Sequence, residues 1–571
     1  MKSIEYQVTE YAHQVLVKAK ILAPGETPQQ MFERVVNTLF EVEKEFNTPL
    51  EETLREKEHF AEFIAGKAFT PGTPTLNNAG RADHADSALS SCAIIPVDLR
   101  KKDEAVEKIR AYYRQNMGSG FDFTPYEDPV GLLVWLNELS AQETATGKYD
   151  RYIGNMGNLH VSHPKIREFI RLKRERCLPH FNLSVDVDED FMEAAINGRQ
   201  YALKDGTVLE ATHLLREIAQ NAWSSGDPSI INLERMNRDN PLINLLPYTT
   251  TPPCSEMGMA TGETCQFGYI NIAYFIKPGG MNYPLLEAAT RSITRALDNA
   301  VEISAKHYPD QLSSRIARFK RKIGIGLSGI ADTFLYYDIP YDSDQARQLV
   351  KDVASFVNYT SKVASVELAE RRGSCEAMNN HKENRYYRRY LENRYGNGSG
   401  TVSAQNWERL GEHIRKTGQL RNILTTTQPP AARVSILMNC SPGIEPIFGI
   451  PASENELRPS IRVFVKKHAG DQADQIIRQA LIDGTFQHTD LSGKECLKTA
   501  KEISPLDHLQ MVTVLAGKDG VIDEAVSKTV NLPNQAKVED VLNVFILAHK
   551  LGLKNIAVYR DGSIENQPFK L

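Results

Sequence analysis

The sequence predicts an α/β fold built from parallel β/α units. Short apolar strand-like runs alternate with helix-like runs from about residue 90 to residue 562. A glycine-rich turn at 324–329 joins one such strand directly to a helix. The chain has 571 residues, 41% of them hydrophobic, which is enough to bury a large core. Alternation of this kind favours a parallel sheet, because parallel strands need a crossover connection.

Residues 10–70 are expected to form helices ahead of the alternating region. Thr27 is a plausible N-cap, Pro28 suits the first helical position, and apolar residues recur at 31, 32, 35, 36, 39 and 40. The turn-rich stretch 66–80 then opens a new region. We therefore expect an N-terminal helical region, residues 1–70, followed by an α/β region, residues 71–571.

The later elements are predicted in chain order. We expect strands at 90–97, 180–187, 265–275, 322–328 and 554–562, and helices at 102–116, 188–198 and 329–339. A polar insert at about 380–402 is basic and rich in tyrosine. It is interpreted as a solvated surface helix and loop rather than an RNA contact.

Composition excludes several classes of protein. Lys and Arg number 67 against 72 Asp and Glu, so the net charge of −5 gives no basic field for nucleic acid. No apolar run is long enough for a signal peptide or a membrane span, which makes the cytoplasm the expected compartment. The seven cysteines include no CxxC pair, which disfavours a disulfide scaffold and a zinc ribbon.

The segment 249–271 concentrates chemically active side chains. Cys254 and Cys265 lie eleven residues apart, Glu256 lies between them, and Pro252 and Pro253 come directly before the first thiol. A single cysteine is more often a buried, inert residue than a reactive one. The carboxylate and the second thiol make this segment the first candidate for a chemical site.

A run of short segments, in order along nearly the whole chain, resembles the catalytic subunit of ribonucleotide reductase, most closely its adenosylcobalamin-dependent class. These segments are 71–80, 89–97, 116–123, 154–173, 181–187, 226–238, 321–332, 420–426, 443–448, 525–533 and 552–563. The resemblance implies a ten-stranded α/β barrel of two antiparallel five-stranded parallel halves. In this chain the barrel domain would be residues 71–571, with a finger loop at 249–265.

The resemblance also implies the roles of the reactive residues. Cys254 matches the finger-loop cysteine that abstracts the 3′-hydrogen of the substrate as a thiyl radical. Glu256 matches the carboxylate that accepts the 3′-OH proton. Cys92 and Cys265 match the pair that delivers two electrons and closes to a disulfide. The other cysteines are expected to be inert: Cys177, Cys375, Cys440 and Cys496.

The substrate-binding positions that the resemblance implies depart from the family pattern. In the finger loop, Pro252 replaces an asparagine and Ser255 a glycine. In the phosphate-binding turn, 429–435, Ala431, Ala432 and Arg433 replace Thr, Gly and Thr or Ser, and Arg433 is the expected phosphate ligand. The other matching positions are Thr73, Ser91 and Gly118. The segment expected to read an effector also departs, with Arg151, Asn155 and Met156 at its matching positions.

Cofactor and partners follow from the same resemblance. Ala557 and Val558 stand where the class with a separate metal-bearing subunit has two adjacent tyrosines, and the Tyr386–Tyr387 pair lies in the polar insert instead. Both observations favour adenosylcobalamin as the radical source. The expected partners are a ribonucleotide, a dNTP effector, a second copy in a homodimer, and a thioredoxin-like dithiol or a separate chain as reductant. No nucleic acid or membrane partner is expected, nor is dATP inhibition through an N-terminal ATP-binding module.

Three functions remain open from the sequence. The first is a divergent cobalamin-dependent reductase. The second is a paralogue that uses the thiyl radical for another nucleotide or sugar reaction, such as dehydration or epimerisation, which Pro252 and the altered phosphate turn favour. The third is an inactive homologue that only binds nucleotide. The Cys92–Cys265 pair favours reduction, because a redox-neutral reaction needs no electron pair.

Overall fold

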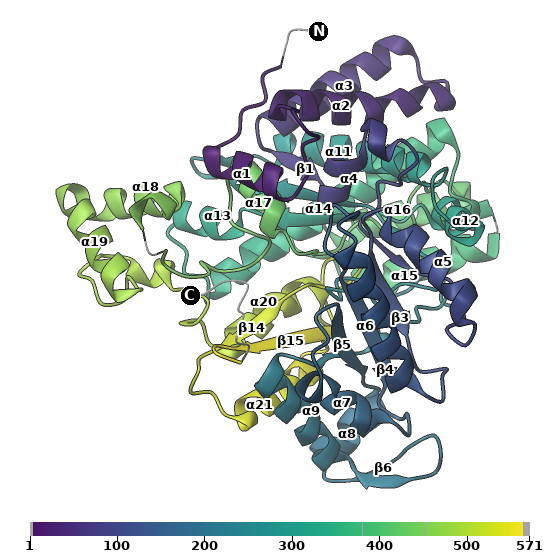
Figure 1. Cartoon of the computed structure of the whole chain (residues 1–571). Helices are drawn as coiled ribbons and strands as arrows, with labels where there is room; N and C mark the ends of the chain where they lie inside the picture. Colours follow the sequence, from purple (N-terminus) through teal and green to yellow (C-terminus); the bar gives the residue numbers. More distant parts are fainter. Residues whose placement is uncertain (1–3, 380, 452, 564–571) are drawn as a thin grey trace.

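The N-terminal helical region predicted from the sequence is confirmed. The computed structural model describes residues 4–379, 381–451 and 453–563. Its first helices are α1 (Glu10–Lys18), α2 (Pro28–Glu41) and α3 (Leu50–Ala65). Thr27 caps α2 in a capping box with Gln30, and Pro28 is the first helical residue. Helices α2 and α3 lie across the top of the molecule and pack on the long helix α11 (Tyr283–Ser304) (Figure 1).

The larger sheet contains a run of parallel strands, as the alternation predicts. Its parallel neighbours are β2 (Cys92–Ile94), β3 (Gly118–Asp122), β4 (Asn155–His160), β5 (Phe181–Asp186) and β8 (Ser229–Ile231). Between these strands run α5 (Lys102–Tyr113), α6 (Pro129–Ala145), α7 (Ile166–Glu175), α8 (Glu189–Ile196) and α9 (Ala211–Ser225). The β/α units over this half of the chain are therefore confirmed.

The strand direction reverses at both edges of this parallel run. The short strand β9 (Thr264–Cys265) pairs antiparallel with β2. At the other edge β15 (Asn555–Arg560) pairs antiparallel with β8, and β14 (Thr529–Leu532) lies parallel to β15. The larger sheet thus has eight strands in the order β14-β15-β8-β5-β4-β3-β2-β9.

A smaller sheet begins where β9 ends. Its strands are β1 (Phe69–Pro71), β10 (Phe267–Asn271) and β13 (Gly324–Ser328), with β10 parallel to β13. Gly329, in the left-handed conformation, turns β13 into α13 (Ile330–Tyr336), as the glycine-rich turn predicts. Single parallel bridges join Ile325 to Thr426 and Gln428 to Val526, just before β14. Within the described residues, regular pairing thus forms two main sheets rather than one ten-stranded ladder.

Further elements surround the two sheets. The strands β6 (Gln200–Ala202) with β7 (Val208–Glu210), and β11 (Ile276–Lys277) with β12 (Gly280–Met281), form small hairpins. Helices α18 and α19 form the lobe that projects at the left of Figure 1. No helix in the part of the chain that the structure describes combines the length and apolar character needed to span a membrane. The remaining α-helices are α4 (Thr73–Asn78), α10 (Leu233–Arg238), α12 (Gln311–Lys320), α14 (Asp344–Arg372), α16 (Ala404–Thr417), α17 (Ala432–Met438), α18 (Pro459–Ala469), α19 (Ala473–Asp483), α20 (Pro505–Ala516) and α21 (Val538–Lys550).

The polar insert is not the solvated surface helix that the sequence suggested. It forms α15 (His381–Tyr395), which packs on α16. Tyr387, Tyr390 and Tyr395 are all buried there, against Trp407 and other apolar residues of a separate core. Tyr390 and Tyr395 each donate a hydrogen bond to Asp523. The prediction was wrong because the buried stripe of this helix is made largely of tyrosine, which a hydrophobicity pattern scores as polar.

Candidate active site

Two glycines of β3 allow the finger loop to lie close to the larger sheet. A Cβ atom on Gly118 would lie 3.1 Å from Cγ of Pro253 and 3.2 Å from Sγ of Cys92. A Cβ atom on Gly120 would overlap the carbonyl oxygen of Thr251. Any larger side chain would force the loop away from β3. The glycines of β3 thus allow the finger loop to lie beside Cys92.

Cys92 and Cys265 are brought together although 173 residues separate them in the chain. They are directly opposed in the antiparallel pair of β2 and β9, and both are buried. The Cys265 Sγ atom lies 3.8 Å from the carbonyl oxygen of Cys92. The neighbouring Cys265 thiol, together with burial, raises the pKa of Cys92 well above that of a free thiol. Both cysteines are free thiols in this structure.

Cys254 lies at the tip of the finger loop and is exposed on the wall of a cavity. Burial by the surrounding protein raises the pKa of the Cys254 thiol, and Glu256 raises it further. Ser255, in the left-handed region with φ 57°, turns the chain directly after the thiol. Serine at this conformation is strained where glycine would not be.

Glu256 is buried without a partner for one of its carboxylate oxygens. The residue is 2% exposed, and Oε2 has no hydrogen-bond partner among the described residues. Burial raises the pKa of this carboxyl to about 7. Its backbone carbonyl accepts hydrogen bonds from Thr427 Oγ1 at 2.5 Å and from Ala525 N at 3.0 Å. The backbone is therefore fixed, while the carboxylate remains available for proton transfer near neutral pH.

The cavity beside Cys254 has a volume of about 640 Å³. Cys254, Ser255 and Pro253 line it on the finger-loop side, and Asn182 contributes from β5. Much of its wall is apolar and includes Pro429, Pro430, Ala431, Ala432, Ile436, Ile444, Phe448, Ala557 and Val558. A large, mostly apolar cavity with a thiol and a few polar groups is typical of a cofactor or substrate site.

A buried network of charges supports the base of the finger loop. Lys322 Nζ lies 2.8 Å from Glu524 Oε1, 2.9 Å from Glu263 Oε1 and 2.8 Å from the carbonyl oxygen of Gly258. Glu524 in turn accepts a hydrogen bond from the Gly258 amide, and Glu263 accepts one from the Ala260 amide. Although burial opposes its charge, the two carboxylates raise the pKa of Lys322, so it stays protonated.

A second lysine completes this network. Lys320 Nζ lies 2.7 Å from Glu263 Oε1 and is also buried. Burial lowers the pKa of Lys320 to about 8. No local pattern marked Lys322 or Glu524 in the sequence, because each acts through residues far away along the chain.

The phosphate-binding turn predicted at 429–435 forms the start of α17. Ala431 is its N-cap, has no side-chain hydrogen bond to the helix, and is buried, whereas Ala432 is exposed and lines the cavity. Tyr269 OH donates to the carbonyl oxygen of Pro430 at 3.1 Å and holds the turn against β10. Arg433 is exposed, and burial of part of its side chain, with Arg151 nearby, lowers the pKa of its guanidinium.

The other predicted substrate and effector positions differ in their surroundings. Thr73 is half-buried at the start of α4, and Ser91 is buried next to Cys92. Arg151 Nη1 donates to the carbonyl oxygens of Ser91 at 2.9 Å and Asn116 at 3.1 Å, so the loop before β4 contacts the residue directly before Cys92 and β2. Asn155 and Met156 lie in β4 itself rather than in that loop.

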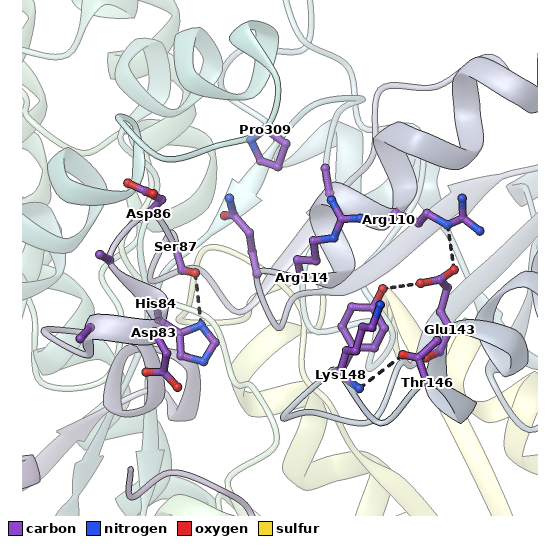
Figure 2. A pocket seen from close by; sticks show the side chains of 15 residues that line it. Asp83, His84, Asp86, Ser87, Arg110, Arg114, Glu143, Thr146, Lys148 and Pro309 are labelled. Atoms are coloured by element: carbon purple, nitrogen blue, oxygen red, sulfur yellow. Dashed lines mark hydrogen bonds and ion pairs between the residues drawn. The ribbon is translucent and has the colours of Figure 1, made fainter. Parts of the chain in front are cut away.

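A second cavity, of about 860 Å³, lies beside this loop. Asp83, His84 and Ser87 form one wall, Glu143, Thr146 and Lys148 form another, and Arg110 and Arg114 come from α5 (Figure 2). His84 Nε2 lies 2.8 Å from Asp150, and Arg81 and Lys20 also pair with Asp150. The Asp83–His84–Asp150 cluster has the donor atoms for a metal ion, but Arg81 pairs with both of its carboxylates and Lys20 pairs with Asp150, which disfavours a further cation there.

The remaining cysteines follow the sequence-based expectation with one exception. Cys375, Cys440 and Cys496 are buried, as expected for inert thiols. Cys177 is exposed, contrary to the expectation. It lies in the turn between α7 and β5, where no packed layer covers it.

Comparison with known proteins identifies the family. Residues 126–559 match the ribonucleotide reductase barrel domain, and residues 6–84 match the ribonucleotide reductase all-alpha domain. The chain belongs to the ribonucleotide reductase family. An alpha subunit of the class Id ribonucleotide reductase of Actinobacillus ureae has the same fold, with a TM-score of 0.76 over 98% of each chain at 18% identity.

Two curated relatives carry names that specify a cofactor. The vitamin B12-dependent ribonucleoside-diphosphate reductase of Thermoplasma acidophilum is 30% identical over 88% of this chain and 65% of its own length. The protein of the same name from Mycobacterium tuberculosis strain CDC 1551 is 28% identical over 95% of this chain and 77% of its own length. The chain thus spans about two-thirds to three-quarters of these two relatives.

Proposed function

We propose that this protein reduces ribonucleotides to 2′-deoxyribonucleotides by thiyl-radical chemistry. The observation that carries the proposal is that Cys254, which lines a large cavity, lies close to both Glu256 and Cys92, and that Cys92 is opposed to Cys265. These are the groups that a radical reduction of the ribose 2′-carbon requires. The names of the two curated relatives support the same activity.

Each reactive residue has a balanced task in this proposal. Cys254, as a thiyl radical, takes the 3′-hydrogen atom from the ribose and later returns one. Glu256, with its pKa near 7, accepts the 3′-OH proton. The 2′-OH leaves as water, and the thiols of Cys92 and Cys265 supply two hydrogen equivalents and become a disulfide. A dithiol reductant, of the thioredoxin type or on a separate chain, must then restore both thiols.

The residues around Cys254 fit adenosylcobalamin, a form of the vitamin B12 that the names of the curated relatives specify. The broad apolar wall that includes Pro430, Ile444 and Phe448 suits a large macrocycle. Ala557 and Val558 lie in the same wall, so no tyrosine occupies the positions used when a separate subunit supplies the radical. When bound, the cofactor supplies the radical that Cys254 uses, and the chain binds it and excludes water.

The strands are proposed to close into the ten-stranded barrel that the family resemblance implies. The five parallel strands are β2, β3, β4, β5 and β8. At the two edges of this run, β9 and β15 run in the opposite direction. The single bridges at Thr426 and Gln428 continue the pairing from β13 towards β14. We place this barrel in residues 71–571 with the finger loop at 249–265, and the helical region in 1–70.

We further propose nucleotide effector binding and a homodimer. The second cavity borders the loop of Arg151, which contacts Ser91 beside the redox cysteine, so a ligand there can influence the site. Arg114 and Lys148 offer cations for phosphate, whereas Arg110 already pairs with Glu107 and Glu143. Helix α6 carries apolar residues on all sides, and Val130, Val134 and Trp135 are only partly buried, which favours helix packing between two copies.

The deciding experiment is an anaerobic incubation with adenosylcobalamin, a dithiol and each ribonucleoside di- and triphosphate. Products are read by mass spectrometry, with Cys254→Ala as the control. A deoxynucleotide that forms only when Cys254 is present supports the proposal. Cleavage of the cobalt–carbon bond without any deoxynucleotide would instead support the alternative, a different nucleotide or sugar reaction, which Pro252 in the finger loop favours.

A further inference from the structure

Asn182 is a polar residue beside the reactive thiol that has no assigned task. It is the one exposed residue of β5, whose other residues are buried. Its side chain lines the same cavity as Pro253 and Cys254. Its Nδ2 atom donates a hydrogen bond to the carbonyl oxygen of Pro253 at 3.0 Å. A residue from a rigid strand thus contacts the peptide unit directly before Cys254.

The tip of the finger loop, 252–255, has few other restraints. Pro252 and Pro253 have no backbone N–H to donate. The Ser255 amide donates to the carbonyl oxygen of Pro252, and the hydroxyl groups of Ser255 and Thr251 bond each other, so both bonds stay inside the loop. Among the described residues, the bond from Asn182 is the one hydrogen bond that ties this tip to the rest of the protein. The glycines of β3 allow close approach but fix no direction.

We propose that Asn182 is a positioning residue that holds the Cys254 thiol in place by pinning the carbonyl of Pro253. The proposal deepens the thiyl-radical function and rests on it for its catalytic consequence. Hydrogen-atom transfer depends steeply on the separation of the reacting atoms, so a loosely held Cys254 would lower the rate of the chemical step. Substrate binding, which uses other parts of the cavity, should change little.

The first test measures the thiol without any cofactor or nucleotide. Cys254 and Cys177 are the two exposed cysteines of the described chain, so iodoacetamide should label both and Cys177 serves as an internal reference. In Asn182→Leu the Cys254 labelling rate relative to Cys177 should rise about 3- to 10-fold, since the tip loses one hydrogen bond. The matched control is Asn197→Leu, which should leave the ratio unchanged: Asn197 is the exposed C-cap of α8, and its side chain bonds Glu193 of the same helix.

The second test compares kcat for two substitutions at position 182. Leucine removes the hydrogen bond and should lower kcat about 3- to 10-fold. Aspartate has nearly the shape of asparagine, but its carboxylate opposes the Pro253 carbonyl and should lower kcat about 10- to 100-fold. KM should stay within about twofold in both. A role in packing alone predicts the reverse order, because aspartate conserves the shape.

The thermal unfolding temperature of each variant shows whether an effect comes from a destabilised fold or from a misplaced Cys254. An unchanged labelling ratio in Asn182→Leu, or wild-type kcat in Asn182→Asp, would overturn the proposal. If the wild-type protein makes no deoxynucleotide, the function proposed above fails. The iodoacetamide experiment still tests whether Asn182 holds the loop, because it needs neither cofactor nor substrate.

Discussion

Lys322 and Glu524 form a buried ion pair beneath the finger loop, with 2.8 Å between Nζ and Oε1. Both partners also bond Gly258, Lys322 to its carbonyl oxygen and Glu524 to its amide. The pair therefore holds one peptide segment from both sides. Buried ion pairs add little net stability, but removing one partner leaves an uncompensated charge.

We expect Lys322→Met to destabilise the protein by about 3–5 kcal/mol, because Glu263 and Glu524 lose their shared cation. Chemical denaturation measures this change, and the kcat of the folded fraction should fall as well. Lys165→Met is the matched control: Lys165 pairs with Glu168 on the surface, where water replaces the lost partner. A Lys322→Met protein as stable as the control would show that the network does not hold the loop.

The pKa of Glu256 predicts how activity depends on pH. Burial raises this pKa to about 7, and a general base must be ionised to act. The kcat should therefore increase with pH, with a midpoint near pH 7, and become constant at higher pH. Glu256→Gln should lower kcat by about 10²- to 10⁴-fold above pH 7, and by less at lower pH, where Glu256 of the wild type is itself protonated. If the residual kcat of Glu256→Gln shows the same pH dependence as the wild type, the titration belongs to another group.

The same pKa makes a separate prediction for stability. Because the folded pKa lies above the unfolded value, near 4.3, ionisation of Glu256 opposes folding as the pH rises from about 4 to about 7. Glu256→Gln removes that cost, so it should be more stable than the wild type at pH 8 by up to about 4 kcal/mol. At pH 4 the two proteins should be equally stable. Urea denaturation at both pH values measures the difference.

Local sequence patterns predicted those helices and strands whose boundaries are set by neighbouring residues. Thr27 and Pro28 signal the start of α2, and the glycine turn after β13 signals the start of α13. The α15 prediction failed because its buried stripe is made of tyrosines that bond Asp523, a residue more than a hundred positions away. The pattern of residues along the helix does not indicate a partner so far away in the sequence.

The candidate site was predictable only where a family resemblance was available. Cys92 and Cys265 meet through strand pairing across 173 residues, which no periodicity reveals. Asn182 and Lys322 went unnoticed for the same reason. Asn182 reaches a loop 71 residues away, and Lys322 one 64 residues away. Such residues act through tertiary contacts, so their residue type alone does not mark them.

Arg433 is predicted to bind the phosphates of the nucleotide. It is exposed at the start of α17, and the neighbouring alanines offer no hydroxyl groups. Arg433→Ala should raise the KM for a ribonucleotide about 10- to 100-fold and leave kcat nearly unchanged, because a charge-assisted bond is lost in both ground and transition states. The KM of Arg433→Lys should lie between those of the wild type and Arg433→Ala, since lysine keeps the charge but not the bidentate geometry. An unchanged KM in Arg433→Ala would mean that this side chain simply faces solvent.

The Cys92–Cys265 pair is predicted to form a disulfide on oxidation without any change of fold. Opposed residues of an antiparallel pair lie about 4.5–5.5 Å apart at Cα, within the roughly 4.4–6.8 Å that a disulfide needs. Mild oxidation with diamide should therefore link these two cysteines, as peptide mapping would show, and leave Cys375 and Cys440 reduced. Without a reductant, each wild-type active site should make one deoxynucleotide and stop with this disulfide formed. Cys92→Ser should make none yet still exchange the 3′-hydrogen, because Cys254 remains; continued turnover in Cys92→Ser would assign the electron delivery to other thiols.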